Sequence, residues 1–125
     1  MNASSFVPPE LESPVRVMIF AACREGWYAA SDEEREEQAL PALRRLLDDW
    51  SDMGLDLIGS FDDDYFLVGQ PGSLQYAIFI LAEVESMERL VAIVNRARTT
   101  VDGLRADRYF RFEARAGRKL FLLDN

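Results

Sequence analysis

The chain has 125 residues, of which 49% are hydrophobic, and a formal net charge of −8 from 22 acidic and 14 basic residues. This length is typical of one domain that buries its own core. The negative charge would repel a phosphate backbone or an anionic membrane surface, so we expect no nucleic-acid partner and no membrane partner. No apolar run in the sequence reaches the roughly 18 residues that cross a bilayer.

Two further counts limit the chemistry and the compartment. The chain contains no histidine, which excludes a Ser-His-Asp triad, a histidine-ligated haem and a histidine-containing zinc site from this chain alone. The single cysteine, Cys23, has no partner for an internal disulfide, and residues 1–14 lack the basic and apolar segments of a secretory signal. We therefore expect a cytoplasmic protein in which Cys23 is a thiol of the core.

The first half of the chain predicts an arm, a strand and an interrupted helix. Residues 1–14 contain three prolines and predict a flexible arm. Residues 15–23 are apolar at nearly every position, which is typical of a central strand covered on both faces. Residues 31–53 begin with a Ser-x-x-Glu capping pattern, continue with apolar residues at helical spacing and end in Met-Gly, so they predict a helix. Pro41 should bend or split this helix near Gln38.

A second strand is predicted over residues 55–62, which alternate imperfectly between apolar and polar side chains. We expect Leu55, Leu57 and Phe61 on its buried face. Residues 65–68 could form a short strand of their own before a turn rich in glycine.

The last third of the chain predicts a strand, a helix and a strand. Residues 75–84 form the most uniformly apolar run and predict a second central strand. Ser86 should cap a helix that runs from Met87 to about Arg98. Its inward residues should be Leu90, Val91, Val94 and Ala97. Residues 108–116 alternate with a period of two. Phe110, Phe112 and Ala114 should share one face of this strand, and Tyr109, Arg111, Glu113 and Arg115 the other.

This order of elements predicts an α+β, ferredoxin-like βαββαβ fold over residues 15–122, with a four-stranded sheet and two helices on one face, followed by a tail at 123–125. Because both central strands are apolar, the other sheet face needs a cover, and a second subunit is the simplest one. We therefore expect a homodimer of the dimeric α/β barrel type. Acidic residues concentrate in the first 64 positions, which hold 15 of the 22, so this half could meet the more basic half of a second copy.

Three adjacent carboxylates, Asp62, Asp63 and Asp64, are the predicted catalytic residues. They lie at a strand end, where alternation lets at most two of them converge on one site. Like charges at this spacing raise one another's pKa, which suits acid/base chemistry. The alternatives are a solvated turn that caps backbone amides and a site for a hard cation. Because no acidic group stands at EF-hand spacing, we expect no metal, and no organic cofactor is predicted.

The predicted substrate-binding residues are aromatic or basic. Arg111 and Arg115 could bind a carboxylate through two hydrogen bonds each, or pair with Glu113 or with acids of a second subunit. Trp27 and Tyr28 follow the first strand and either cover the edge of the core or close over a ligand. Two further tyrosines complete the predicted set: Tyr65 and Tyr109.

Several segments resemble one family. Residues 59–64 (Gly-Ser-Phe-Asp-Asp-Asp), 68–69, 98–100 and 108–118, which end in Glu-Ala-Arg-Ala-Gly-Arg, are similar to the IacB-like proteins linked to bacterial indole-3-acetic acid degradation. The chain also resembles, more broadly, the dimeric α/β barrel proteins, which include cofactor-independent monooxygenases, muconolactone-type isomerases and haem-degrading enzymes. The resemblance implies a small aromatic or indole-derived ligand bound between sheet and helices. The absence of histidine argues against the haem branch.

We therefore expect an accessory enzyme of aromatic or indole catabolism that acts on a small oxidised ring acid by cofactor-independent acid/base chemistry. Asp63, together with Asp62 or Asp64, would move the proton, and Arg111 or Arg115 would hold a carboxylate. Two alternatives remain open: a non-catalytic dimeric module that binds the same ligand, and a cofactor-independent monooxygenase.

Overall fold

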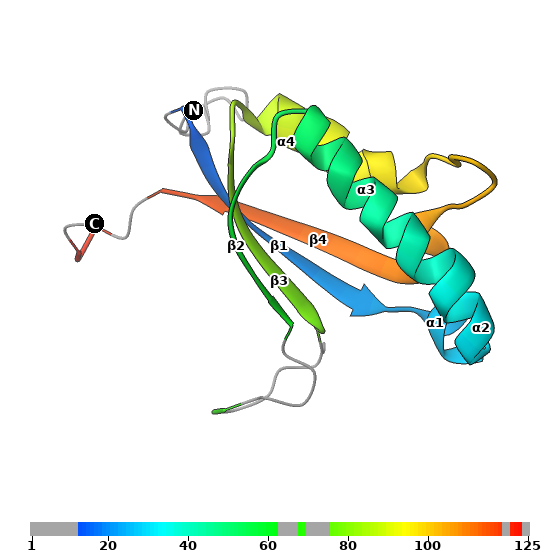
Figure 1. Cartoon of the computed structure of the whole chain (residues 1–125). Helices are drawn as coiled ribbons and strands as arrows, with labels where there is room; N and C mark the ends of the chain where they lie inside the picture. Colours follow the sequence, from blue (N-terminus) through cyan, green and yellow to red (C-terminus); the bar gives the residue numbers. More distant parts are fainter. Residues whose placement is uncertain (1–12, 63–67, 70–75, 119–120, 124–125) are drawn as a thin grey trace, which may run out of the picture.

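The computed structural model describes residues 13–62, 68–69, 76–118 and 121–123. One antiparallel sheet of four strands, in the order β2-β3-β1-β4, forms the centre of the fold (Figure 1). Its strands are β1 (Val15–Cys23), β2 (Asp56–Asp62), β3 (Ile78–Val84) and β4 (Phe110–Gly117). The two most apolar strands, β1 and β3, are central, and the fold is ferredoxin-like α+β as predicted. Nearly all of the predicted arm at residues 1–14 lies outside the described residues.

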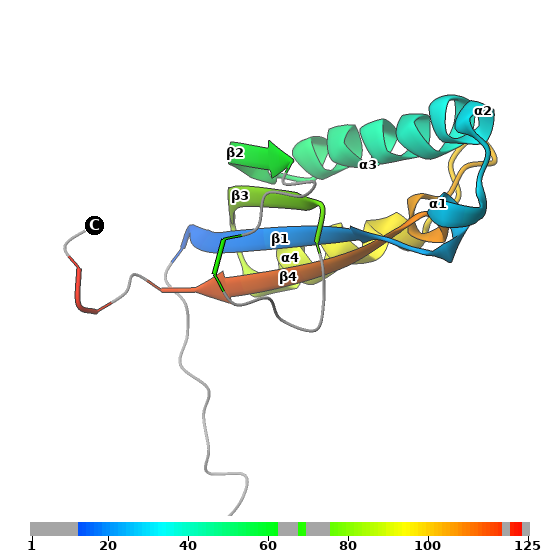
Figure 2. The same ribbon diagram turned by 90° about the horizontal axis from the view of Figure 1, so that it is seen from below.

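Two main helices, α3 (Leu40–Asp52) and α4 (Met87–Asn95), pack on the same face of the sheet (Figures 1 and 2). The short elements are α1 (Glu25–Ala29), α2 (Asp32–Glu34), the π-helical η2 (Arg35–Ala39) and two 3-10 turns, η3 (Arg96–Arg98) and η4 (Ala106–Arg108). No helix within these described residues is long and apolar enough to cross a membrane.

The helix around Pro41 is interrupted as predicted. Ser31 Oγ accepts a hydrogen bond from the Glu34 amide at 3.1 Å, which caps the start of α2. Pro41 lacks an amide donor and crowds the preceding turn. The five residues of η2, directly before α3, adopt the wider π pattern, so the hydrogen-bond ladder changes around Gln38.

The main core lies between the sheet and the two long helices. Alternate residues of β1, among them Val17 and Ile19, face Trp50 of α3 and Ile93 of α4, all of them buried. The ring of Trp50 meets Phe112 edge to face at 5.3 Å. One inward residue of α4 was predicted wrongly: Val91 is 56% exposed. Ile93, three positions after Leu90, is buried in its place, because the sheet meets the helix along that side.

The predicted buried face of β2 is also wrong in part. Leu55 is buried, but Leu57 and Phe61 are 58% and 61% exposed. The register shifts between Leu57 and Gly59, where a β-bulge adds a residue to the edge strand. As a result Leu57 is paired with Ala82, on the helix side, whereas Phe61 is paired with Phe79, on the opposite side.

No helix of the described residues covers the second face of the sheet, which we call the open face (Figure 2). Strand alternation and register assign to it Arg16, Met18, Phe20, Asp56, Phe61, Phe79, Leu81, Glu83, Arg111, Glu113 and Arg115. Aromatic and aliphatic side chains occupy its centre and charged side chains its border. It is therefore less uniformly apolar than the sequence of the two central strands indicated.

Candidate functional site

Three aromatic rings form a cluster on the open face, which we call the aromatic platform. The ring of Phe20 in β1 lies 5.1 Å from that of Tyr76 and 5.6 Å from that of Phe79 in β3, between ring centroids. All three side chains are partly exposed in the described chain. Such a cluster presents an apolar surface with the geometry that aromatic ligands prefer.

Polar groups from β4 stand directly beside this platform. Because Glu113 is paired with Phe20 in the β1–β4 register, its carboxylate lies next to the rings. The Tyr76 hydroxyl donates a 2.6 Å hydrogen bond to Glu113 Oε2. Arg115 Nε lies 3.6 Å from the same oxygen, and its guanidinium carbon lies 5.9 Å from the centre of the Phe20 ring.

The Tyr76–Glu113 hydrogen bond moves both pKa values. The bond holds the pKa of the Glu113 carboxyl below its ordinary value, with help from the charge of Arg115. The same bond, followed by burial, raises the pKa of the Tyr76 phenol. At neutral pH the pair is therefore a carboxylate and a neutral phenol. Arg111, Arg115 and Glu113 together leave one positive charge at this border of the open face.

The structure confirms that Arg111 and Arg115 share one face of β4 with Glu113. Of the roles predicted for Arg115, the ion pair with Glu113 is the one that the structure shows. Tyr109 does not belong to this face. It has α-helical backbone angles at the end of η4, so alternation starts only at Phe110, and its side chain packs in a second small cluster with Ala39, 1% exposed.

Asp62 is the one predicted catalytic aspartate within the described residues, and the fold does not bring it to the arginines. Asp62 ends β2 and is paired with Ile78, whose side chain packs on the helix side of the sheet. Two strands separate β2 from β4, a distance of roughly 14 Å at the usual strand spacing. Asp62 is thus on the other face and at the other edge from Arg111 and Arg115. Asp63, Asp64 and Tyr65 lie outside the described residues.

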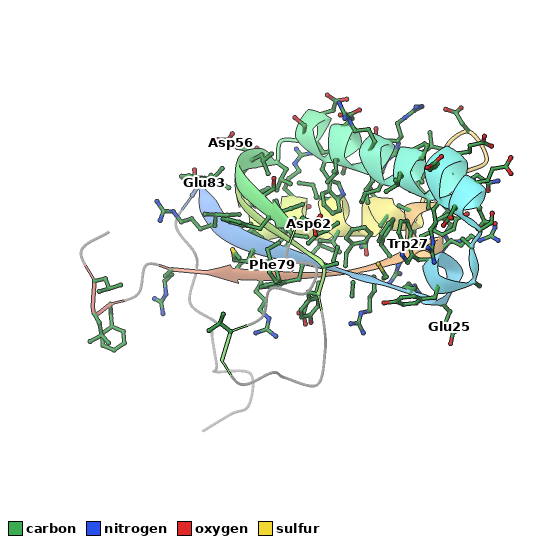
Figure 3. All side chains as sticks on the ribbon, turned by 60° about the horizontal axis from the view of Figure 1, so that its bottom comes forward. Glu25, Trp27, Asp56, Asp62, Phe79 and Glu83 are labelled. Atoms are coloured by element: carbon green, nitrogen blue, oxygen red, sulfur yellow. The ribbon has the colours of Figure 1, made fainter. Side chains whose placement is uncertain are left out.

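Trp27 and Tyr28 separate as well. Trp27 covers the edge of the core: its ring lies 5.4 Å from that of Phe110, and the Arg35 guanidinium sits 4.9 Å from its centre. Tyr28, one residue later on α1, is 71% exposed. Figure 3 shows Trp27 beside α1, at the opposite end of the sheet from Asp56 and Glu83. The first of the two alternatives, covering of the core, thus describes Trp27.

Sequence reasoning did not select Tyr76 as a site residue, nor Glu113 as more than a partner for arginines. A signal for Glu113 existed, since it alternates with Arg111 and Arg115 on a strand. Tyr76 precedes β3 by two residues and reaches Glu113 only through the pairing of both strands with β1. No pattern of neighbouring residues in the sequence predicts the hydrogen bond between Tyr76 and Glu113.

Comparisons of this protein with family models, with curated proteins and with solved structures found no match. In the described part of the chain, no three acidic or cysteine side chains gather where they could hold a metal ion. The fold and the site therefore define the class only: a ferredoxin-like α+β protein with an aromatic platform on the open face of its sheet.

Proposed function

We propose that the protein is a homodimeric binding module for a small aromatic acid, and that the ligand lies on the open face. The observation that carries this proposal is the meeting of the aromatic platform with Arg115 and the Tyr76–Glu113 pair. A flat ring gains from contact with Phe20 and Phe79, and its carboxylate from a guanidinium fork. The resemblance to IacB-like proteins supplies the ligand class, an indole-derived or related aromatic acid.

A second copy of the chain is the proposed cover of this face. The acidic residues Asp56 and Glu83 lie at the β2–β3 side of the open face, where Glu83 already lies 3.6 Å from Arg16, and Arg111 and Arg115 lie at the β4 side. Asp56 and Glu83 are neighbours in the register and in Figure 3. A two-fold arrangement brings the acidic side of one copy to the basic side of the other and encloses the ligand between the two apolar centres.

Binding is favoured over catalysis by the protonation states of the site. A carboxylate with a lowered pKa is a weak base, and a phenol with a raised pKa is a weak acid, so neither member of the Tyr76–Glu113 pair is tuned for proton transfer near neutral pH. The catalytic alternative, a cofactor-independent enzyme of aromatic or indole catabolism, uses the same face, with this short hydrogen bond as its proton path. A monooxygenase would bind its substrate there too.

Calorimetric titration with indole-3-acetate and with benzoate tests the proposal. We expect saturable binding that Arg115→Gln weakens about tenfold, because a charge-assisted hydrogen bond is lost. Arg89→Gln is the matched control, since Arg89 is exposed on α4, on the other side of the sheet. Absence of binding by the wild type, or equal losses in both variants, would contradict an aromatic-acid site on the open face.

Turnover separates the catalytic alternative from the binding module. Wild type is incubated with indole-3-acetate and its hydroxylated or oxidised derivatives, and products are followed by chromatography. The binding module predicts no product. Turnover that is abolished both in Tyr76→Phe and in Glu113→Gln would replace the module by an enzyme that uses this pair.

A further inference from the structure

A cavity of about 440 Å³ lies at the end of the sheet where β1 ends and β4 begins, and we propose that it binds a small oxyanion, a carboxylate or a phosphate. We call it the arginine cleft. Its polar lining consists of Arg24, Gln38, Arg105, Asp107, Arg108 and Tyr109. None of the three rings of the aromatic platform lines it, so this site is separate from the proposed aromatic site and does not depend on it.

The charges of the cleft are not balanced. Arg105 uses Nε and Nη2 to hold both carboxylate oxygens of Asp107, at 2.5 and 2.9 Å. Arg24 donates from Nη1 to the backbone oxygen of Asp107 at 3.0 Å, and the Arg108 guanidinium lies 5.5 Å from the Tyr109 ring centre. Among the described residues, neither Arg24 nor Arg108 has a carboxylate at ion-pair distance. The lining thus carries a surplus of positive charge in a chain whose net charge is −8.

A second cavity in the same molecule shows the contrasting arrangement. It has a volume of about 250 Å³ and is also lined by two arginines, Arg45 and Arg96. Arg45 lies 2.9 Å from Asp102, and Arg96 lies 3.1 Å from Asp49, so each guanidinium already has a carboxylate partner. An added anion gains little there. The arginine cleft differs because, among the described residues, two of its three guanidinium groups have no carboxylate partner.

The backbone holds the arginines of the cleft in place. The Arg24 amide donates to the Tyr109 carbonyl oxygen at 2.8 Å. A Cβ atom at Gly26 would lie 2.2 Å from the carbonyl oxygen of Arg108, so α1 and η4 approach as closely as only glycine permits. Arg24 and Arg108 therefore enter the cleft from two backbone segments locked to one another. The backbone is thus held at both positions, while the Arg24 and Arg108 side chains are exposed and accessible to a ligand.

The lining also determines the chemical class of the ligand. Leu104 is the one aliphatic side chain in it, and the Tyr109 ring is buried rather than offered as a stacking surface. Burial raises the pKa of the Tyr109 phenol, and the nearby Glu34 raises it further, while the hydroxyl lies 3.5 Å from Gln38 Oε1. The phenol remains neutral and forms a polar wall. These groups suit a small, strongly hydrated oxyanion and offer nothing to a large ring.

The proposal is tested by recording amide NMR spectra during titration with inorganic phosphate and, separately, with succinate, at constant ionic strength set by chloride. We expect saturable shifts confined to residues 24–26 and 103–109. The ion that saturates at the lower concentration identifies phosphate or carboxylate as the natural group. If neither ion shifts these amides at concentrations up to about 20 mM, which would saturate a site with a Kd of about 1 mM, the proposal is wrong.

Three variants assign the binding to the cleft. Arg108→Gln should weaken the affinity about tenfold, whereas Arg44→Gln, which removes the same charge from an exposed position on α3, should leave it within about twofold. Asp107→Asn should tighten binding, because it removes the one carboxylate of the lining and frees Arg105. A gain of affinity cannot come from a damaged fold. Equal losses in Arg108→Gln and Arg44→Gln, or a weaker Asp107→Asn, would overturn the proposal.

Discussion

Tyr76 and Glu113 are joined by a 2.6 Å hydrogen bond although they lie 37 positions apart in the chain. The bond crosses β1, because β3 and β4 flank that strand on either side. Phe20 of β1 is paired with Glu113 in the strand register, and the centroid of its ring lies 5.1 Å from that of the Tyr76 ring. The Tyr76 phenol thereby links the segment that leads into β3 to β4, and its ring completes the aromatic platform.

The pKa of Glu113 should report this bond. In Tyr76→Phe the carboxyl loses its donor, so its pKa should rise toward the ordinary value of 4.5, as measured by NMR titration of the side-chain carbon. Tyr28→Phe, on the exposed tyrosine of α1, should leave it unchanged. A Glu113 pKa that is equal in wild type and Tyr76→Phe would contradict the bond.

The same bond makes stability depend on pH in a defined direction. The folded-state pKa of Glu113 is lower than the unfolded one, so the folded protein binds fewer protons in the interval between them. The stabilisation is complete above about pH 4.5 and disappears as the pH falls through the folded-state pKa. Denaturant unfolding of wild type and Tyr76→Phe should therefore show a difference at pH 7 that narrows below pH 4.5. A difference that widens in acid would contradict this.

If the open face is the dimer interface, a charged substitution at its centre should produce a monomer. Leu81→Asp places a charge at the apolar centre of that face and should halve the mass measured by light scattering at micromolar concentration. Val91→Asp is the matched control, because Val91 is already exposed on α4. A wild type that is itself monomeric, or a Leu81→Asp variant that remains dimeric, would remove the open face as the interface.

Gly26→Ala should destabilise the end of the sheet. The added Cβ meets the Arg108 carbonyl oxygen at 2.2 Å, which is backbone and must move, so we expect a loss of about 1–3 kcal/mol in the free energy of unfolding. Gly117→Ala adds the same atom where nothing lies within 4 Å and should cost far less. Both are measured by urea denaturation. Equal losses of unfolding free energy in the two variants would show that α1 can move enough to accommodate the methyl group.

Trp50 is buried in the main core, and its indole Nε1 has no hydrogen-bond partner among the described residues. Trp50→Ala should cost about 3–5 kcal/mol, since it leaves a large cavity beside Phe112. Trp50→Phe should cost much less, because the smaller cavity is partly offset by removal of an unpaired buried donor. Thermal and urea unfolding compare the two. Both variants remove the indole donor, so equal losses would contradict cavity size as the source of the difference.

The elements could be predicted because their signals are local. The unbroken apolar runs of β1 and β3 predict central strands, and the Ser31 cap and Pro41 predict where a helix starts and where its ladder changes. The orientation of the elements is less local. Val91 and Ile93 both fit an apolar stripe on α4, and only the position of the sheet decides which one is buried.

The site was harder to predict than the fold. Alternation along β4 correctly places Arg111 and Arg115 together, because a strand has a period of two. The bulge after Leu57 reverses the face of the residues that follow in β2, and it leaves no mark in the hydrophobic pattern. The partnership of Tyr76 with Glu113 depends on the register of three strands. The composition of the acidic triplet predicts a catalytic site, yet Asp62 lies on β2, at the opposite edge of the sheet from the arginines of β4.

The π-helical segment Arg35–Ala39 changes the rotation of α3 about the helix axis relative to α2. A π turn accommodates one residue more than an α turn, and each residue of an α-helix advances the direction of its side chain by about 100°. With the extra residue, α3 can direct Leu46 and Trp50 into the core while Glu34 of α2 reaches Tyr109. Because one residue turns an α-helix by about 100°, the inserted residue sets which side of α3 faces the sheet relative to α2.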